Sequence, residues 1–290
     1  MITLRQSGKQ LQGYAFVITS ILLQTLGYLL VFKCLINSAT MTALTFVLSA
    51  IVFGALTVKR WAYIAKVIQR DIGLFIRFSI YVFVMVAPVF LCEIHGVHPI
   101  VYCLIFSAGM AGIAALEKRS AWCALYFLMT GITLYVGIHT TPYTLLAPLG
   151  PIGGLQVLRL SSRYIQTHQA TTSEIMVLRF VLLAGIALCL APYFQFTLLL
   201  THWHLALLGA SIVLSLNILP VYCSQKAVAY VGHNTVAVSF AFMPVIIFIA
   251  QLDVIRHTHI ELLGIAIALF ATILVAKRYP LIIKSNTLLA

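Results

Sequence analysis

The sequence predicts an all-α integral membrane protein with ten transmembrane helices, arranged as two inverted repeats of five helices. Three observations predict this class: the composition, the number of apolar segments and an internal repeat. Of the 290 residues, 62% are hydrophobic and 8% are charged, and the mean hydropathy is +1.07. A typical soluble domain has roughly 45–50% apolar and 25% charged residues, so this composition excludes an ordinary soluble protein.

Ten apolar segments are each close to the ~20 residues that a helix needs to cross a bilayer. They are Tyr14–Phe32, Ala39–Val58, Ile72–Cys92, Pro99–Leu116, Ala121–Ile138, Pro142–Arg159, Ile175–Phe196, Leu205–Cys223, Asn234–Leu252 and Ile260–Ala276. We expect helices because an unpaired backbone cannot face lipid, and no segment alternates as barrel strands do. The longest connections, Lys59–Asp71 and Leu160–Glu174, leave no room for a catalytic domain outside the membrane.

An internal repeat divides the chain into residues 1–139 and 140–290. Six positions of the first half recur 136 residues later with the same or a similar residue: Gly96, Phe106, Ile113, Ala114, Leu116 and Glu117 match Gly232, Phe242, Ile249, Ala250, Leu252 and Asp253. Leu44–Ala50 resembles Leu178–Ala184 at nearly the same spacing. Because each copy has five helices, an odd number, the second copy enters the membrane from the opposite side. Such inverted repeats are a recurrent plan of secondary transporters.

The distribution of Lys and Arg predicts the orientation. With both termini inside the cell, 14 of the 18 basic residues are cytoplasmic: Arg5, Lys9, Lys59, Arg60, Lys66, Arg70, Lys118, Arg119, Arg159, Arg163, Lys226, Lys277, Arg278 and Lys284. Only Lys33 and Arg256 fall outside, which agrees with the positive-inside rule and with the inner (cytoplasmic) membrane. This distribution accounts for the net charge of +12 without a nucleic-acid partner.

Two arginines, Arg77 and Arg179, lie within apolar segments near their cytoplasmic ends. We expect both side chains to extend along their helices to the interface, with Glu174 as a possible partner of Arg179. No carboxylate or histidine lies at mid-span, whereas a proton relay normally needs such a group on its path. The sequence therefore favours facilitated diffusion or exchange.

Several short motifs resemble those of EamA-type transporters of the drug/metabolite transporter superfamily. The motifs are Leu178-Arg179-Phe180, Met243-Pro244-Val245, Leu252-Asp253 and Leu263-Gly264. The first half departs from the pattern, since Thr45 replaces the arginine and Ala108 stands where the proline would be. The resemblance implies a carrier of small organic metabolites, with amino acids or related amphipathic and zwitterionic compounds as the expected substrates.

Neutral polar and aromatic side chains within the segments are the candidate substrate-lining residues. They are Gln24, Tyr28, Tyr81, Ser107, Gln156, Asn217, Tyr222 and Ser239. The alternative for each one is an interhelical hydrogen bond. The run Pro148–Gly154 contains two prolines and three glycines, which indicates either an interrupted helix open to a solute or glycines that permit close helix packing.

No cofactor or metal site is expected, because the six cysteines form no CxxC pair. Seven of the nine histidines face outside under this topology, and we call them the outer histidines: His95, His98, His139, His202, His204, His257 and His259. They are either passive interfacial residues or a rim that mild acid charges, because the ordinary pKa of histidine lies near ~6.5. Their His-x-His pairs lack a fixed third metal ligand.

The sequence predicts a transporter and not an enzyme, since its acidic residues are too scattered to form a catalytic cluster. The expected partners are a small-molecule substrate and the lipid bilayer, and the protein is expected to be a monomer or a homodimer. Two alternatives stay open: a membrane-embedded enzyme, and an assembly or signalling protein that transports nothing.

Overall fold

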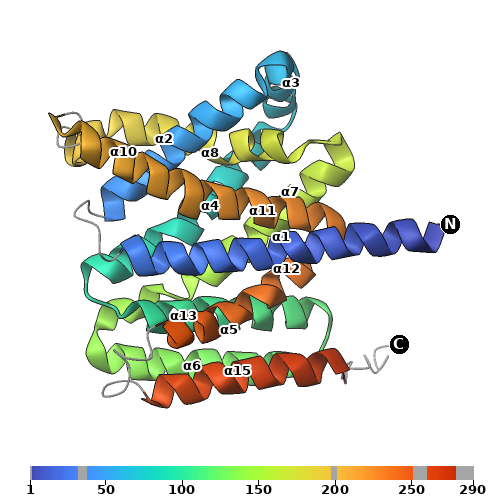
Figure 1. Ribbon diagram of the computed structural model, residues 1–290, viewed down its shortest axis with the longest axis vertical. Coiled ribbons are helices and arrows are strands. Elements are labelled where there is room, and N and C mark those ends of the chain that lie inside the picture. The colour runs from blue at the N-terminus through green and yellow to red at the C-terminus, as the bar shows by residue number, and fades with distance from the viewer. Residues whose placement is uncertain (1, 32–37, 197–200, 251–259, 279–290) are drawn as a thin grey trace, which may run out of the picture.

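The computed structural model describes residues 2–31, 38–196, 201–250 and 260–278, which form helices and, among themselves, no strand. The main helices lie side by side in one bundle (Figure 1). Their bounds are α1 (Ile2–Val31), α2 (Ser38–Leu56), α3 (Trp61–Arg70), α4 (Ile72–Ile94), α5 (Pro99–Glu117), α6 (Trp122–Thr140), α7 (Leu149–His168), α8 (Thr172–Cys189), α10 (Trp203–Ile212), α11 (Leu219–Val231), α12 (His233–Ser239), α13 (Met243–Ala250) and α15 (Ile260–Arg278). Short helical turns join them: η1 (Val58–Arg60), η2 (Pro142–Leu146), η3 (Ala191–Tyr193), η4 (Val213–Ile218) and η5 (Phe240–Phe242).

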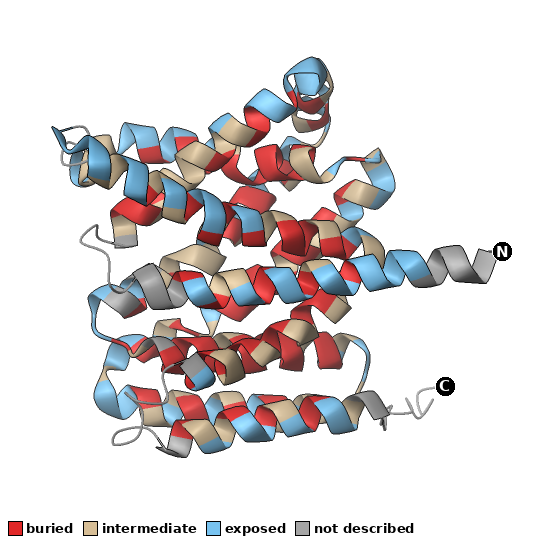
Figure 2. Cartoon of the chain, viewed as in Figure 1, coloured by how far each residue is buried: buried red, intermediate tan, exposed pale blue. Residues whose placement is uncertain are grey.

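The all-helical class is confirmed, and long apolar helices support the membrane character, although fewer than ten of them are long enough to span a membrane among the described residues. Six of the described helical stretches are long and apolar enough to cross a membrane: Ala39–Leu56, Ile72–Val89, Ile100–Glu117, Trp122–Thr140, Thr172–Cys189 and Trp203–Val231. Every one of the ten predicted segments overlaps a described helix. The outward sides of the bundle are exposed (Figure 2) and carry large apolar side chains such as Phe83, Leu128 and Leu207, as a surface that faces lipid requires.

The polar connection expected at Lys59–Asp71 is itself helical. After η1, the helix α3 buries Ile64 and Val67, whereas Lys66 and Arg70 are exposed. Apolar residues on one side of a helix and charged residues on the other make the helix amphipathic. A search for long apolar segments does not detect such a helix. This helix lies against α4 and α8 at the edge of the bundle.

Four helix pairs make the most extensive contacts: α1 with α11, α2 with α8, α4 with α7 and α5 with α6. Glycines bring two of these pairs close together. A Cβ atom at Gly13 of α1 would lie 2.5 Å from Val231 Cγ1 of α11, and one at Gly153 of α7 would lie 2.6 Å from Met85 N of α4. Small residues at helix contacts are typical of membrane proteins.

Among the six apolar helical stretches, the one in α5 is the most buried, at 78%, whereas the one in the peripheral helix α6 is only 22% buried. Besides α6, the helix α5 contacts α7, α12, η5 and α13. The side chains of Ile100, Leu104 and Ile105 are fully buried in the core that forms around it.

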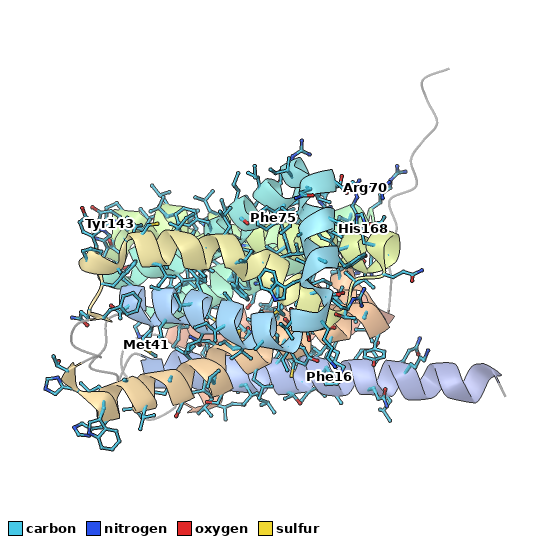
Figure 3. The ribbon with its side chains drawn as sticks, turned by 90° about the horizontal axis from the view of Figure 1, so that it is seen from above. Phe16, Met41, Arg70, Phe75, Tyr143 and His168 are labelled. Atoms are coloured by element: carbon cyan, nitrogen blue, oxygen red, sulfur yellow. The ribbon has the colours of Figure 1, made fainter. Side chains whose placement is uncertain are left out.

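The start of α1 and the end of α15 lie on the same side of the bundle, which we call the terminal face (right in Figure 1). Arg70 and His168 lie toward this face, and Tyr143 of η2 lies at the opposite one (Figure 3). This arrangement agrees with the expectation that both termini are on one side of the membrane. The basic residues Lys33, Arg256 and Lys284, which entered the predicted orientation, are outside the described residues.

Candidate functional site

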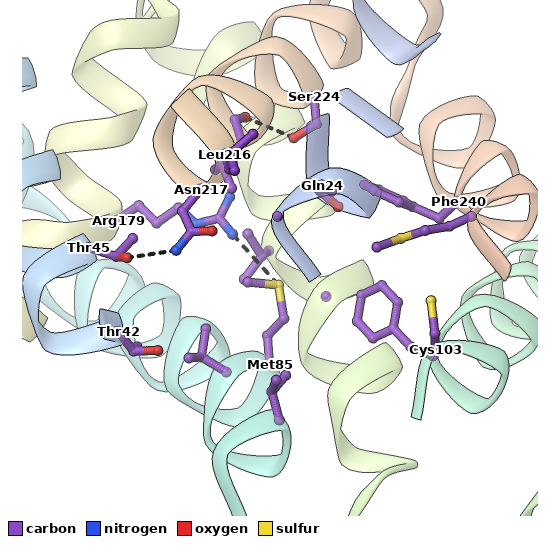
Figure 4. A pocket seen from close by; sticks show the side chains of 18 of the residues that line it. Gln24, Thr42, Thr45, Met85, Cys103, Arg179, Leu216, Asn217, Ser224 and Phe240 are labelled. Atoms are coloured by element: carbon purple, nitrogen blue, oxygen red, sulfur yellow. Dashed lines mark hydrogen bonds between the residues drawn. The ribbon is translucent and has the colours of Figure 1, made fainter. Parts of the chain in front are cut away.

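A cavity of about 230 Å³ lies between the helices (Figure 4). The first half contributes side chains from α1, α2, α4 and α5, and the second half contributes them from α7, α8, η4, α11, η5 and α13. The peripheral helices α6 and α15 contribute none of the described lining residues. Both halves of the chain thus line the cavity about equally.

One end of the cavity is polar and cationic. Asn217 of η4 donates from Nδ2 to the Thr45 hydroxyl of α2 at 3.1 Å, and that hydroxyl donates to the Met41 carbonyl at 2.8 Å. The Arg179 guanidinium of α8 lies beside Asn217 and faces Met85 (Figure 4). Two helices from the second half and two from the first therefore meet at this end.

The rest of the cavity is mainly apolar and aromatic. Phe106 packs edge-on against Phe240, with ring centroids 6.1 Å apart, and lies 6.1 Å from the ring of Tyr102. Four methionines share the lining: Met41, Met85, Met110 and Met243. Because unbranched thioether side chains change shape at little cost, this surface suits an apolar group of variable outline.

A short π-helical turn, η4, interrupts the long helix from Trp203 to Val231 and carries Asn217 to the cavity. Pro220 follows it and has no N–H, so the Leu216 carbonyl lacks the donor that a regular helix would supply. Gly27 of α1 lies against this carbonyl, since a Cβ there would be 3.0 Å from Leu216 O. Single π turns occur frequently at functional sites.

The interruption expected at Pro148–Gly154 is not present. The helix α7 begins at Leu149 with Pro148 as its N-cap, so Pro151 falls in the first turn, where the missing N–H costs no helical bond. Gly153 and Gly154 instead permit close contact with α4 and α5. Of the two readings of this run, the structure agrees with close helix packing.

Of the eight predicted lining residues, Gln24 and Asn217 line the cavity. Five others are not among its lining residues: Tyr81, Ser107, Gln156, Tyr222 and Ser239. Tyr222 stacks on Phe53 with ring centroids 5.6 Å apart, and Ser239 donates to the Thr235 carbonyl at 2.8 Å. Ser107 is fully buried within α5. Tyr28 belongs to α1, but its side chain is outside the described residues.

Arg179 was expected to reach the cytoplasmic interface beside Glu174, and both parts of this expectation are wrong. The arginine is only 3% exposed and lines the cavity. Glu174 is 1% exposed and pairs with Arg60 Nε at 2.6 Å. In contrast, Arg77 of α4 is exposed, as expected. An arginine inside an apolar segment does indicate a functional residue. Its side chain is long enough to reach the membrane interface, however, and this led to the wrong prediction of its position.

The ion pairs among the described residues all join the first half of the chain to the second. Glu117 pairs with Arg159 and lies 3.4 Å from His233 Nε2, while Asp71 lies 3.2 Å from His168 Nε2. The fourth pair is Arg60 with Glu174. These residues lie in η1, between α3 and α4, at the end of α5, in the second part of α7 and at the starts of α8 and α12, and these parts are toward the terminal face.

Most of the outer histidines that the structure describes contact neighbouring rings or cap a helix, and His202 hydrogen-bonds the Thr201 hydroxyl at 2.9 Å. His95 stacks on Tyr143 with ring centroids 3.4 Å apart, and His139 packs edge-on against Tyr135 at 4.6 Å. His98 caps α5 by accepting from Ile100 N at 3.3 Å. His257 and His259 are outside the described residues. No group of three His, Cys, Asp or Glu side chains within the described part of the chain could hold a metal ion.

No protein-family profile, no curated protein and no solved structure gives a significant match to this chain. The resemblance to EamA-type transporters therefore rests on the sequence motifs alone.

Proposed function

We propose that this protein is a secondary carrier that moves small organic metabolites across the inner (cytoplasmic) membrane by alternating access. The observation that carries the proposal is the cavity of about 230 Å³ that both halves of the chain line. In secondary transporters, the substrate site typically lies between two structural repeats. At ~30 Å³ per water molecule, the cavity has room for about eight waters, which suits a small metabolite.

The helix contacts support ten spans in two inverted repeats. In this scheme α1, α2, α4, α5 and α6 correspond in order to α7, α8, α10–α11, α12–α13 and α15. When the two repeats are exchanged, the contact of α1 with α11 becomes the contact of α7 with α4. The exchange also turns α2 into α8 and α8 into α2, so the contact between these two helices stays the same. These are three of the four most extensive pairings, and this symmetry of the contacts supports a two-fold arrangement.

The backbone at the repeated glycines supports the same scheme. Gly96 and Gly232 occupy matching positions of the sequence repeat, and their φ angles are +73° and +81°. No other glycine in the described residues has a positive φ. Each lies shortly before the helix that would be fourth in its repeat, α5 or α12. Glycine suits these turns because a side chain would strain a positive φ.

The ion pairs toward the terminal face suit one gate of an alternating-access cycle. Every described pair joins the two halves, so separating the halves at this face would break all of them. With the termini in the cytoplasm, this gate is the inner one. The contacts would hold it closed while the opposite face opens to the outside.

Uptake by purified protein in proteoliposomes tests the proposal. A mixture of small metabolites, including amino acids and organic acids, is offered and the vesicle contents are measured by mass spectrometry. We expect at least one solute to enter or exchange. The variant Val86→Trp fills the cavity and should abolish uptake, whereas Phe83→Trp on the exposed side of the same helix should not.

Failure of every offered solute to enter or exchange, with folded protein in the vesicles, would contradict the carrier proposal. Equal uptake by the Val86→Trp and Phe83→Trp variants would instead show that this cavity is not on the transport path. The first of these results would favour one of the two alternatives, a membrane-embedded enzyme or an assembly or signalling protein.

A further inference from the structure

Arg179 is a buried cation whose charge no described side chain neutralises. Its Nε is buried without a hydrogen-bond partner, and its Nη2 lies 3.6 Å from the thioether sulfur of Met85. Its other charge-related contact is with the ring of Phe180, 5.2 Å from the guanidinium carbon. The acidic side chains that the structure describes, Asp71, Glu117 and Glu174, are all paired with other residues.

An unpaired charge inside an apolar bundle is costly, because neither water nor a counter-ion compensates for the lost hydration. Ionisable residues at such positions in membrane proteins usually face a cavity and mark a binding site or pathway. Arg179 faces the cavity, beside Asn217 (Figure 4). A negatively charged ligand in this cavity would supply the missing partner.

We propose that the cavity binds small organic monoanions through their carboxylate, with Arg179 as the group that receives the charge. This inference deepens the proposed carrier function and rests on it for its biological meaning. A guanidinium has a planar set of donors that matches the two oxygens of a carboxylate. The unpaired Nε and the Nη2 that contacts only sulfur are the two donors available for such a pair.

The remaining lining defines the rest of the ligand. Arg179 is the only cationic side chain among the described lining residues, so the site matches a single negative charge better than a phosphate dianion. The described lining includes no carboxylate that could pair with an ammonium group. Phe106, Phe240 and the four methionines offer an apolar surface for a tail. The site therefore selects a carboxylic acid with an apolar tail over the corresponding amine or amino acid.

Binding to the purified protein in detergent tests this selection without any transport. The probes are 3-phenylpropanoate, 4-methylpentanoate, 3-phenylpropanamide, 3-phenylpropylamine and phenylalanine, and the readouts are thermal stabilisation and calorimetry. We expect both carboxylates to bind. Charge-assisted hydrogen bonds of this kind correspond to affinities about 10- to 100-fold higher than those of the amide and the amine. A native protein that binds the amide as tightly as the acid would overturn the inference, as would failure of both carboxylates to bind.

The variant Arg179→Gln should weaken 3-phenylpropanoate binding by the same factor and leave 3-phenylpropanamide binding unchanged. Arg179→Lys keeps the charge but not the paired donors, so its affinity for 3-phenylpropanoate should lie between those of the native protein and the Arg179→Gln variant. Arg77→Gln is the matched control, because it removes an arginine from an apolar helix at an exposed position. Without ligand, Arg179→Gln should melt at a higher temperature than the native protein, whereas a purely structural role for the arginine predicts the reverse.

The outcomes separate this inference from the carrier proposal. Carboxylates that bind through Arg179 but never cross proteoliposome membranes would leave the binding site standing and remove the transport function. Uptake of other solutes by a protein that binds neither carboxylate would leave the transport function standing and overturn the inference.

Discussion

Adding one methyl group at Gly153 tests the arrangement of the bundle. In the variant Gly153→Ala, the new Cβ would lie 2.6 Å from Met85 N and 2.8 Å from Tyr81 O. Both are backbone atoms of α4, so no side-chain rotation relieves the contact and α4 and α7 must move apart. Such overpacking costs about 1–3 kcal/mol. Alanine is favoured over glycine within a helix by roughly 0.5–1 kcal/mol, so we expect a net loss of stability of up to about 2.5 kcal/mol.

The matched control is Gly185→Ala in α8, where an added Cβ has nothing within 4 Å. Only the preference of a helix for alanine over glycine applies at this position, so the free energy of unfolding should rise by roughly 0.5–1 kcal/mol. The free energy of unfolding is measured for both variants by titration with SDS in mixed micelles. Equal stabilities of the Gly153→Ala and Gly185→Ala proteins would show that α4 and α7 are not in close contact, and would refute the helix arrangement on which the cavity depends.

Three further predictions follow from single features of the bundle. The side chain of Gln225 is fully buried and neither of its polar atoms has a hydrogen-bond partner, so Gln225→Met should raise the free energy of unfolding by about 1–3 kcal/mol; unchanged stability would contradict this. Glu117→Gln removes two contacts between the halves, one of them with the partly exposed Arg159. In a protein whose single cysteine is Cys103, the Glu117→Gln substitution should increase the rate of thiol labelling from the terminal face about fivefold, which corresponds to ~1 kcal/mol in the free energy of opening. An unchanged labelling rate would argue against a gate at this face. Replacing all seven outer histidines with Gln should alter the dependence of transport on external pH between roughly 5 and 8; indistinguishable profiles would make them passive surface residues.

The helices themselves were predictable because lipid leaves the backbone few alternatives. The segment predicted from Pro99 to Leu116 corresponds to α5 from Pro99 to Glu117, and its start follows from a proline at the first helical position. The helical residues outside the apolar segments were not predicted, such as α3 and the last part of α7. They are amphipathic, so their helical form depends on the neighbouring helices that cover one side of them.

The site was less predictable, because a residue's position along a helix does not say which way the helix turns it. Gln24 and Asn217 face the cavity, whereas Gln156 does not, although all three are amides within apolar segments. Rotation about the helix axis is set by contacts such as Gly27 against the Leu216 carbonyl, which join residues far apart in sequence.

Arg179 illustrates the same limit. Its distance from the start of α8 would allow an extended side chain to reach the surface, but that start is itself covered. Glu174, Ile175 and Met176 are all at most 1% exposed. Glu174 completes a capping box with Thr171 and pairs with Arg60, so the route along the helix is occupied and its carboxylate is already engaged. The Arg179 side chain therefore lies in the cavity.

Supplying Arg179 with a permanent partner tests whether its charge awaits a ligand. The Met85 sulfur lies 3.6 Å from Arg179 Nη2, and a glutamate has nearly the same length as methionine, so Met85→Glu places a carboxylate beside the guanidinium. A buried charge gains several kcal/mol when a well-placed counter-ion neutralises it, and breaking such a pair costs about 3–5 kcal/mol. We therefore expect this variant to melt at a higher temperature than the native protein, to be stabilised no further by 3-phenylpropanoate, and to lose uptake of carboxylates. Met85→Gln is the matched control, since it has the same shape without the charge and should still bind the acid. If Met85→Glu destabilises the protein more than Met85→Gln does, the environment of Arg179 already neutralises its charge, and the reasoning that assigns an anion to this cavity fails.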